Sequence, residues 1–171
     1  MRHINIEIKA FCDHQDEIRQ ILESKNADFK GLDHQIDTYF NVHYGRLKLR
    51  EGNIENHLIH YKRDDKEGPK QSDVTLFKSQ PGSMLKKILT SALGILVVVE
   101  KNREIFYIDN VKFHLDRVER LGTFIEIEAI GDSESTNREK LVEQCKFYLD
   151  LFKISYADLV NVSYSDMILS D

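Results

Sequence analysis

The chain of 171 residues has 41% hydrophobic residues, 31% charged residues and only two prolines. This composition excludes a disordered, collagenous or low-complexity protein, and the length predicts a single domain over residues 1–171. The formal net charge of −5 argues against nucleic acid or an anionic membrane surface as a partner, although a local basic site can exist within an acidic total.

Targeting and cysteine signals are weak. Polar residues interrupt the N-terminal segment too often for a signal peptide, and the longest apolar run, residues 94–99, is at most a third of a membrane span. Cys12 and Cys145 have neither zinc-ligand spacing nor a disulfide framework, so we expect buried thiols. These features predict a soluble protein of the cytoplasm.

Alternation of apolar and polar residues with a period of two dominates the chain. In residues 4–10 it places isoleucines and an alanine on one face and Asn5, Glu7 and Lys9 on the other. Further strands are predicted at residues 36–42, 46–50, 57–63, 73–78, 95–101, 104–108, 111–119 and 123–130. Because these strands are short and joined by short turns, we expect an antiparallel meander or barrel.

Three segments show helical spacing of apolar residues, which makes the predicted fold class α+β. Asp13 is expected to cap the first helix and Ser83 to open the second, which Gly94 follows. Thr136 and Glu139 have the spacing of a capping box at the start of the third helix.

Like charges recur two residues apart on the polar faces of several strands, as in Lys48/Arg50, Lys101/Arg103 and Glu126/Glu128. A single such pair is typical of a solvated face. Several in one small antiparallel sheet favour a sheet rolled with its charged face inward. Six cations (Lys9, Lys48, Arg50, Lys62, Lys101, Arg103) and four carboxylates (Glu7, Asp116, Glu126, Glu128) would then share one cavity.

The mixture of cations and carboxylates indicates which ligands such a cavity would bind. Burying six unpaired cations is prohibitive, so they require polyanions and carboxylates around them. Lysine and arginine suit phosphate oxygens, whereas carboxylates among them suit Mg²⁺ or Mn²⁺ that bridges protein and substrate phosphates. The residues alone therefore predict a metal-dependent polyphosphate site inside a small β-barrel.

The order of these segments resembles that of the CYTH superfamily, the triphosphate tunnel metalloenzymes. The similar segments are Asn5-Ile6-Glu7-Ile8-Lys9 (for Glu-x-Glu-x-Lys), Gln35–Phe40, Leu47-Lys48-Leu49-Arg50, His60-Tyr61-Lys62-Arg63, Val99–Arg103, His114–Glu128 and Ser155–Leu159. Together they span residues 3–159 in the expected order, and the run from His114 to Glu128 is the most specific.

The resemblance implies an eight-stranded antiparallel barrel that binds a triphosphate along its axis. It implies that Glu7, Asp116, Glu126 and Glu128 hold Mg²⁺ or Mn²⁺, and that the six cations hold the phosphates. It also makes a homodimer plausible. The candidate catalytic residues are Lys9 and Tyr39: Tyr39 either packs at the barrel mouth or lies near Lys9 and helps to polarise the nucleophile. His114 shares the polar face of Asp116 but is not counted among the predicted metal ligands.

The resemblance favours an activity like that of class IV adenylate cyclases, which convert ATP to cyclic AMP and pyrophosphate. Hydrolysis of thiamine triphosphate or inorganic triphosphate is the alternative reaction. Asn5 replaces the first glutamate of the family motif and brings no charge, so a non-catalytic nucleotide or polyphosphate sensor is a further alternative. A barrel for an apolar ligand is disfavoured, because its interior face should be apolar.

Overall fold

A computed structural model describes residues 2–63, 68–132 and 136–171 of the chain, with the backbone alone described for Arg2. The strands are β1 (Arg2–Phe11), β2 (Asp28–Phe40), β3 (Arg46–Glu51), β4 (Asn56–Arg63), β5 (Lys70–Lys78), β6 (Ile95–Ile108), β7 (Val111–Val118) and β8 (Gly122–Gly131). The helices are α1 (Gln15–Ser24), α2 (Leu85–Leu93), α3 (Arg138–Leu151) and α4 (Tyr164–Leu169), with a 3₁₀ turn at Tyr156–Asp158.

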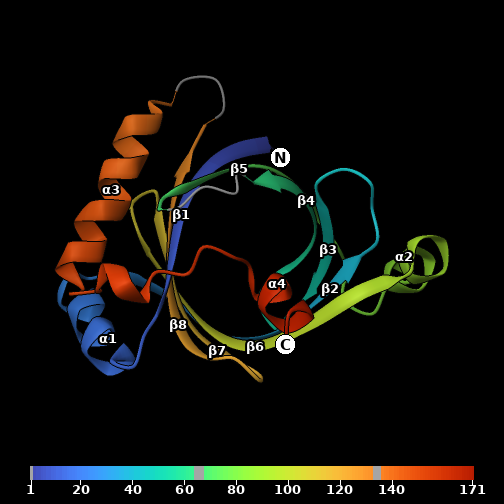
Figure 1. Ribbon diagram of the computed structural model, residues 1–171, viewed down its shortest axis with the longest axis horizontal. Coiled ribbons are helices and arrows are strands. Elements are labelled where there is room, and N and C mark those ends of the chain that lie inside the picture. Colours follow the sequence, from blue (N-terminus) through green and yellow to red (C-terminus); the bar gives the residue numbers. More distant parts are fainter. Residues whose placement is uncertain (1, 64–67, 133–135) are drawn as a thin grey trace.

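The eight strands form one closed barrel in the order β1-β5-β4-β3-β2-β6-β7-β8, and every neighbouring pair is antiparallel. Figure 1 shows the ring of strands, with α1 and α3 on one side and α2 projecting from the other. The predicted α+β fold with an eight-stranded antiparallel barrel is confirmed. None of the helices in the described part of the chain combines the length and the apolar composition of a membrane-spanning helix.

Several predicted boundaries were wrong. The two strands predicted at residues 95–101 and 104–108 are the single strand β6, because the segment stays paired with β2 and β7 across Asn102. β2 begins at Asp28 and β5 at Lys70, both earlier than predicted, and α4 was not predicted. The predicted helix caps are shifted by one residue: His14, Met84 and Asn137 occupy the N-cap positions of α1, α2 and α3. At α3 the Asn137 side chain, rather than Thr136, accepts the hydrogen bond from the backbone of Glu139.

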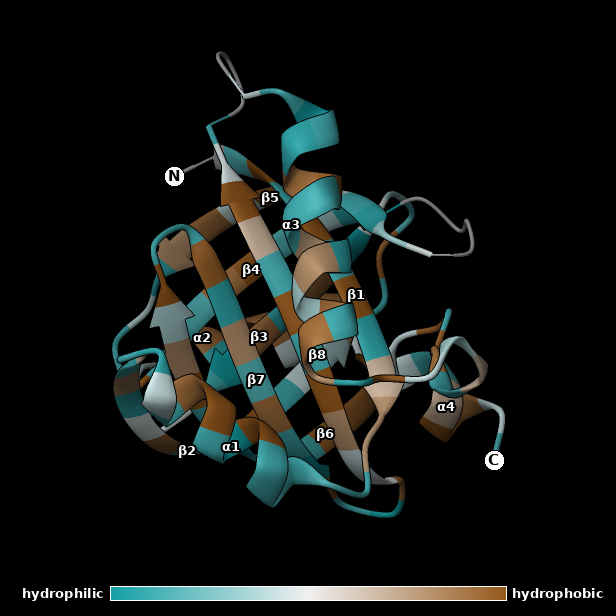
Figure 2. Ribbon diagram, turned by 90° about the vertical axis from the view of Figure 1, so that its left-hand side faces the viewer, coloured by the Kyte–Doolittle hydropathy of each residue, from teal (hydrophilic) through white to brown (hydrophobic). Residues whose placement is uncertain are grey.

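The main hydrophobic core lies outside the barrel. Buried apolar side chains of the outer wall, including Ile6, Phe113 and Ile127, pack against α1 and α3, which contribute Leu22 and Leu149. Figure 2 shows these helices over the alternating apolar and polar bands of β1, β7 and β8. Fully burying one such side chain stabilises the fold by about 1.5–3 kcal/mol. Because strand side chains alternate, the apolar outer face leaves the inward face available for polar residues.

Both cysteines are buried free thiols, as predicted. Cys145 of α3 lies against the barrel wall, where its Sγ donates to the carbonyl oxygen of Ile6 at 3.3 Å. Burial raises the pKa of the Cys145 thiol to about 12, so it is neutral at physiological pH. It acts as a small side chain of the core.

Candidate active site

A polar cavity lies inside the barrel. Among the described residues, its lining includes seven basic side chains (Lys9, Lys48, Arg50, Arg63, Lys101, Arg103, Lys112) and five carboxylates (Glu7, Asp37, Glu55, Glu126, Glu128). Eight of the ten charged residues predicted to face a cavity lie in this lining; Lys62 and Asp116 do not. The barrel is therefore closed with a charged face inward.

Lys62 lies on the outer wall, so its predicted place in the cavity was wrong. The side chain is exposed, and its ammonium group lies 5.0 Å from the centre of the Tyr44 ring. Adjacent residues of a strand point to opposite faces, and Tyr61 and Arg63 face inward in β4. Arg63 takes the inward position, and its Nη1 donates to Glu7 Oε1 at 3.0 Å.

Asp116 lies behind the lining and is fully buried. Arg103, its cross-strand neighbour, donates hydrogen bonds to both carboxylate oxygens, each at 2.7 Å. The Tyr164 hydroxyl also donates to Asp116, at 2.6 Å. Both oxygens accept hydrogen bonds, so Asp116 is placed to orient Arg103.

The part of the cavity wall formed by β2, β3 and β6 is built around Asp37, which was not among the predicted site residues. Its carboxylate accepts hydrogen bonds from Arg50 at 2.8 and 2.9 Å, Lys101 at 2.9 Å and Lys48 at 3.1 Å. Although burial opposes the effect, these three cations hold the pKa of Asp37 well below its usual range. We call Asp37, Lys48, Arg50 and Lys101 the cationic cluster. Its three cations are held close together by one carboxylate and are suited to bind the oxygens of a phosphate chain.

Within the cationic cluster, the surroundings of Lys101 disfavour its charged form. Burial and the nearby charges of Arg50 and Arg103 lower its pKa to about 7, although Asp37 opposes the shift. An added anion would relieve this repulsion. The cluster is therefore poised to accept negative charge.

Tyr39 and Lys9 both line the cavity, but each is paired with a different residue. Lys48 donates to the Tyr39 hydroxyl at 3.4 Å, and burial together with Asp37 raises the pKa of Tyr39 to about 12. Lys9 lies 3.6 Å from Glu126 and 3.9 Å above the centre of the Tyr164 ring. Burial lowers the pKa of Lys9, despite the opposing charges of Glu126 and Glu7. The shift at Lys9 favours its neutral form and the shift at Tyr39 opposes its ionisation, so Lys9 is the stronger candidate of the two for a proton acceptor.

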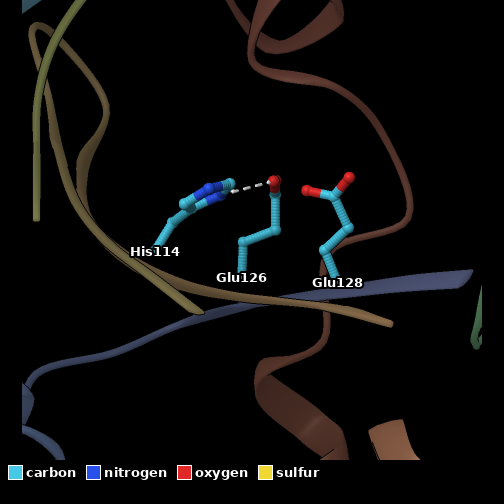
Figure 3. Close-up of side chains that lie close together, drawn as sticks. All are labelled: His114, Glu126 and Glu128. Carbon is cyan, nitrogen blue, oxygen red and sulfur yellow. Dashed lines mark hydrogen bonds and ion pairs between the residues drawn. The ribbon is translucent and has the colours of Figure 1, made fainter. Parts of the chain in front are cut away.

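The part of the wall formed by β1, β7 and β8 contributes Asn5, His114, Glu126 and Glu128, which we call the carboxylate cluster. His114 and Glu126 are cross-strand neighbours on β7 and β8, and His114 Nδ1 lies 3.0 Å from Glu126 Oε1. The Asn5 side-chain amide donates to Glu128. Figure 3 shows the side chains of His114, Glu126 and Glu128 next to one another above the barrel wall.

The environment separates the pKa values of the two glutamates. Burial raises the pKa of Glu128 to about 7; Lys112 opposes this shift, whereas Glu126 and Glu7 reinforce it. The pKa of Glu126 is held well below its usual range by His114, Arg103 and Lys9, against the effect of burial. Burial and the charges of Arg103 and Lys112 lower the pKa of His114 to about 4, so its imidazole is neutral at pH 7.

These residues fit a divalent cation. One ligand atom from each of His114, Glu126 and Glu128 lies within 4.8 Å of the others. Asn5 Oδ1 and His114 Nε2 are buried without a hydrogen-bond partner. Of the four predicted metal ligands, Glu126 and Glu128 come together here, Glu7 lies beside Glu128 but pairs with Arg63, and Asp116 is held by Arg103.

Comparisons with known proteins agree with this architecture. The CYTH domain, as a protein-family model, matches residues 3–157. The chain belongs to the CYTH family. CYTH proteins are in general metal-dependent enzymes that process triphosphates, and this cavity offers both a cationic cluster and a site for a divalent ion.

Solved structures similar to this CYTH protein include the PH1012 protein of Pyrococcus horikoshii, with 25% identity, a TM-score of 0.80 and coverage of 95% of this chain and 98% of that one. An adenylate cyclase candidate from Vibrio parahaemolyticus has 17% identity, a TM-score of 0.71 and coverage of 98% of both chains. An adenylyl cyclase candidate from Hippeastrum, with a dominant triphosphatase activity, has 15% identity, a TM-score of 0.66 and coverage of 98% and 95%. No curated protein matches the chain at a significant level.

The prediction from sequence missed four charged residues of the lining, Asp37, Glu55, Arg63 and Lys112, and discounted His114 as a metal ligand. Asp37 lies on the same strand face as Tyr39, and Lys112 and His114 lie on the same face as Asp116. The alternation of side chains between the two faces of a strand could therefore have identified all three. Arg63 required the correct register of β4. Glu55 lies in the turn before β4, where alternation carries no information, yet its carboxylate accepts from Lys112 at 2.6 Å.

Proposed function

We propose that this CYTH protein is a metal-dependent enzyme that acts on a triphosphate inside its barrel, with an activity like that of class IV adenylate cyclases. The observation that carries the proposal is the division of one cavity into a cationic cluster around Asp37 and a carboxylate cluster suited to a divalent ion. A triphosphate needs both, because its charge must be neutralised along its length and at the reacting phosphorus.

In this proposal Lys48, Arg50 and Lys101 bind the phosphate chain, and Arg103, oriented by Asp116, neutralises charge on the reacting phosphoryl group. A divalent ion, held by the carboxylate cluster, would neutralise negative charge on the phosphate oxygens. The ribose 3′-oxygen forms a bond to the α-phosphorus, and the bond from that phosphorus to the bridging oxygen breaks, so that pyrophosphate leaves. Lys9, whose pKa burial lowers, takes the proton of the 3′-hydroxyl.

The alternative reaction is hydrolysis of a triphosphate, with water in place of the 3′-hydroxyl. Both reactions use the same neutralisation of charge and the same in-line arrangement. The similar Hippeastrum structure is that of a protein with a dominant triphosphatase activity, which supports testing both. The reactions differ in which phosphorus is attacked, and their products identify it.

Phosphorus NMR of reactions with ATP, thiamine triphosphate and inorganic triphosphate, each with Mg²⁺ or Mn²⁺, tests the proposal. We expect cyclic AMP and pyrophosphate from ATP, with the rate reduced in Lys9→Met and unchanged in Lys62→Ala, whose side chain lies outside the barrel. Orthophosphate with ADP or a diphosphate ester would assign the triphosphatase reaction. Binding of these compounds without any turnover would overturn the enzymatic proposal in favour of a sensor.

A further inference from the structure

Two buried polar atoms of the carboxylate cluster have no hydrogen-bond partner. They are Asn5 Oδ1 and His114 Nε2, on side chains that are 5% and 1% exposed. Both residues line the cavity. Leaving such an atom unpaired in a protein interior costs about 1–3 kcal/mol, so the fold tolerates two lone pairs that a ligand in the cavity could use.

The strands hold His114 beside the two glutamates. The register pairs His114 on β7 with Glu126 on β8, and Glu128 follows on the same face of β8. One ring nitrogen of His114 and one oxygen of each glutamate lie within 4.8 Å of one another. The three side chains rise from the same wall, as Figure 3 shows. An ion bound by both glutamates would therefore have the imidazole within reach.

We propose that His114 supplies a ring nitrogen to the divalent ion held by Glu126 and Glu128, with Asn5 Oδ1 as a neutral oxygen ligand, and that this set makes the site favour Mn²⁺ over Mg²⁺. Mg²⁺ prefers oxygen ligands, usually carboxylates and water, whereas an imidazole nitrogen strengthens the binding of first-row transition ions. Asn5 adds to the effect because it contributes no negative charge. The inference rests on the proposed function only in placing the ion beside a triphosphate.

The competing explanation is that His114 only orients Glu126 through its hydrogen bond. In that case the ion would have oxygen ligands alone, and loss of His114 would weaken Mn²⁺ and Mg²⁺ binding to a similar extent. A nitrogen ligand predicts instead a loss that falls mainly on Mn²⁺. The ratio of the two dissociation constants separates the explanations.

The experiment adds Mn²⁺ alone, without substrate, to the whole protein and records electron spin echo envelope modulation. We expect modulation from a directly bound ¹⁴N nucleus in the native protein and in His57→Gln, which removes another histidine of the cavity lining. The modulation should be lost in His114→Gln. Calorimetric titrations should show that His114→Gln weakens Mn²⁺ binding on the order of tenfold, with a smaller change for Mg²⁺.

Absence of ¹⁴N modulation from bound Mn²⁺ in the native protein would overturn the inference, and that measurement needs no variant to fold. An unchanged ratio of Mn²⁺ to Mg²⁺ affinity in a folded His114→Gln protein would also overturn it. Failure of the proposed function gives a different result, because nitrogen-bound Mn²⁺ without triphosphate turnover would leave this inference standing.

Discussion

At the scale of single residues, Asn5 controls the charge of the carboxylate cluster. Its amide donates a hydrogen bond to Glu128, whose pKa is about 7 and whose neighbours include Glu126 and Glu7. A glutamate at position 5 would place a further carboxylate against this group. Repulsion between like charges would destabilise the site without an ion, whereas a bound divalent cation would be held more strongly.

We therefore expect Asn5→Glu to raise kcat for the triphosphate reaction more than it changes KM. If the ion is held more firmly while it neutralises charge in the transition state, the gain is in kcat, whereas uniform binding would change KM. Steady-state kinetics with each metal measure the effect, and Asn5→Gln controls for the longer side chain. A several-fold loss of kcat in Asn5→Glu would show that the cavity is tuned for asparagine.

The lowered pKa of Lys101 couples the binding of an anion to the uptake of protons. Its pKa of about 7 in the folded protein lies below the ordinary value of 10.5, so the unfolded chain binds more protons between these values. This lysine therefore lowers the stability of the ligand-free protein most below pH 7, and that cost is relieved as the pH rises towards 10.5. An anion in the cationic cluster would remove the cause of the shift.

Binding of inorganic triphosphate at pH 8, without metal, should take up protons at Lys101, because the anion raises the pKa of a largely neutral lysine. Calorimetry in two buffers with different ionisation enthalpies measures the number of protons. The matched variant Lys101→Met removes this contribution and leaves that of the ligand itself. Equal proton uptake by both proteins would place the anion away from Lys101.

At the scale of elements, the alternation of side chains between the two faces of each strand determined how much of the site could be predicted. Where alternation was regular, as around Glu7, Arg50 and Glu126, the inward side chains were identified from the sequence. In β4 the adjacent residues Lys62 and Arg63 are both basic, so a pattern of charges alone could not identify the inward one. The register with β3 and β5 decides it, and that depends on contacts between distant segments.

The C-terminal helix could not be predicted for a related reason. α4 has only six residues, too few for a helical period to be recognised. It is fixed by a capping box between Ser163 and Asp166 and by Arg46 of β3, whose Nη2 donates to Asp166 at 2.9 Å. Through these contacts the helix brings Tyr164 to Asp116, and so supports Arg103 from outside the cavity.

The pair Lys62 and Arg63 offers a direct comparison of the two faces of one strand. We expect Arg63→Ala to raise the Kd for inorganic triphosphate about tenfold, or ~1.4 kcal/mol, because a charge-assisted contact inside the cavity is lost. Lys62→Ala removes the same formal charge from the outer wall and should leave the Kd nearly unchanged. Isothermal titration at moderate ionic strength measures both, and equal effects would indicate only long-range attraction.

At the scale of the whole molecule, stability and ligand binding depend on different parts of the barrel. Apolar packing between the barrel wall and α1 and α3 stabilises the fold, whereas the inward face holds closely spaced charges. Those charges are balanced imperfectly, because seven basic side chains face five carboxylates among the lining residues described. A bound polyanion should thus stabilise the folded state.

Inorganic triphosphate at 100 times its Kd should stabilise the protein by about 2.7 kcal/mol, which corresponds to a rise in Tm of roughly 5–10 °C for a chain of this size. Differential scanning fluorimetry measures the shift. Arg50→Ala should lose much of it, and Lys62→Ala should retain it. A full shift in the Arg50→Ala protein would mean that the anion binds elsewhere.

Closure of the barrel also has a consequence for how the chain folds. β1 pairs with β5 and β8, and the carbonyl oxygen of Lys9 accepts a hydrogen bond from the backbone of Val160 at 2.8 Å. The partners of β1 are thus separated from it by 63 positions (Glu7 and Lys70) to 151 positions (Lys9 and Val160) along the chain. Such high contact order predicts refolding over milliseconds to seconds. Until β8 reaches β1, both strands present open edges, and the period before closure is when self-association competes with folding.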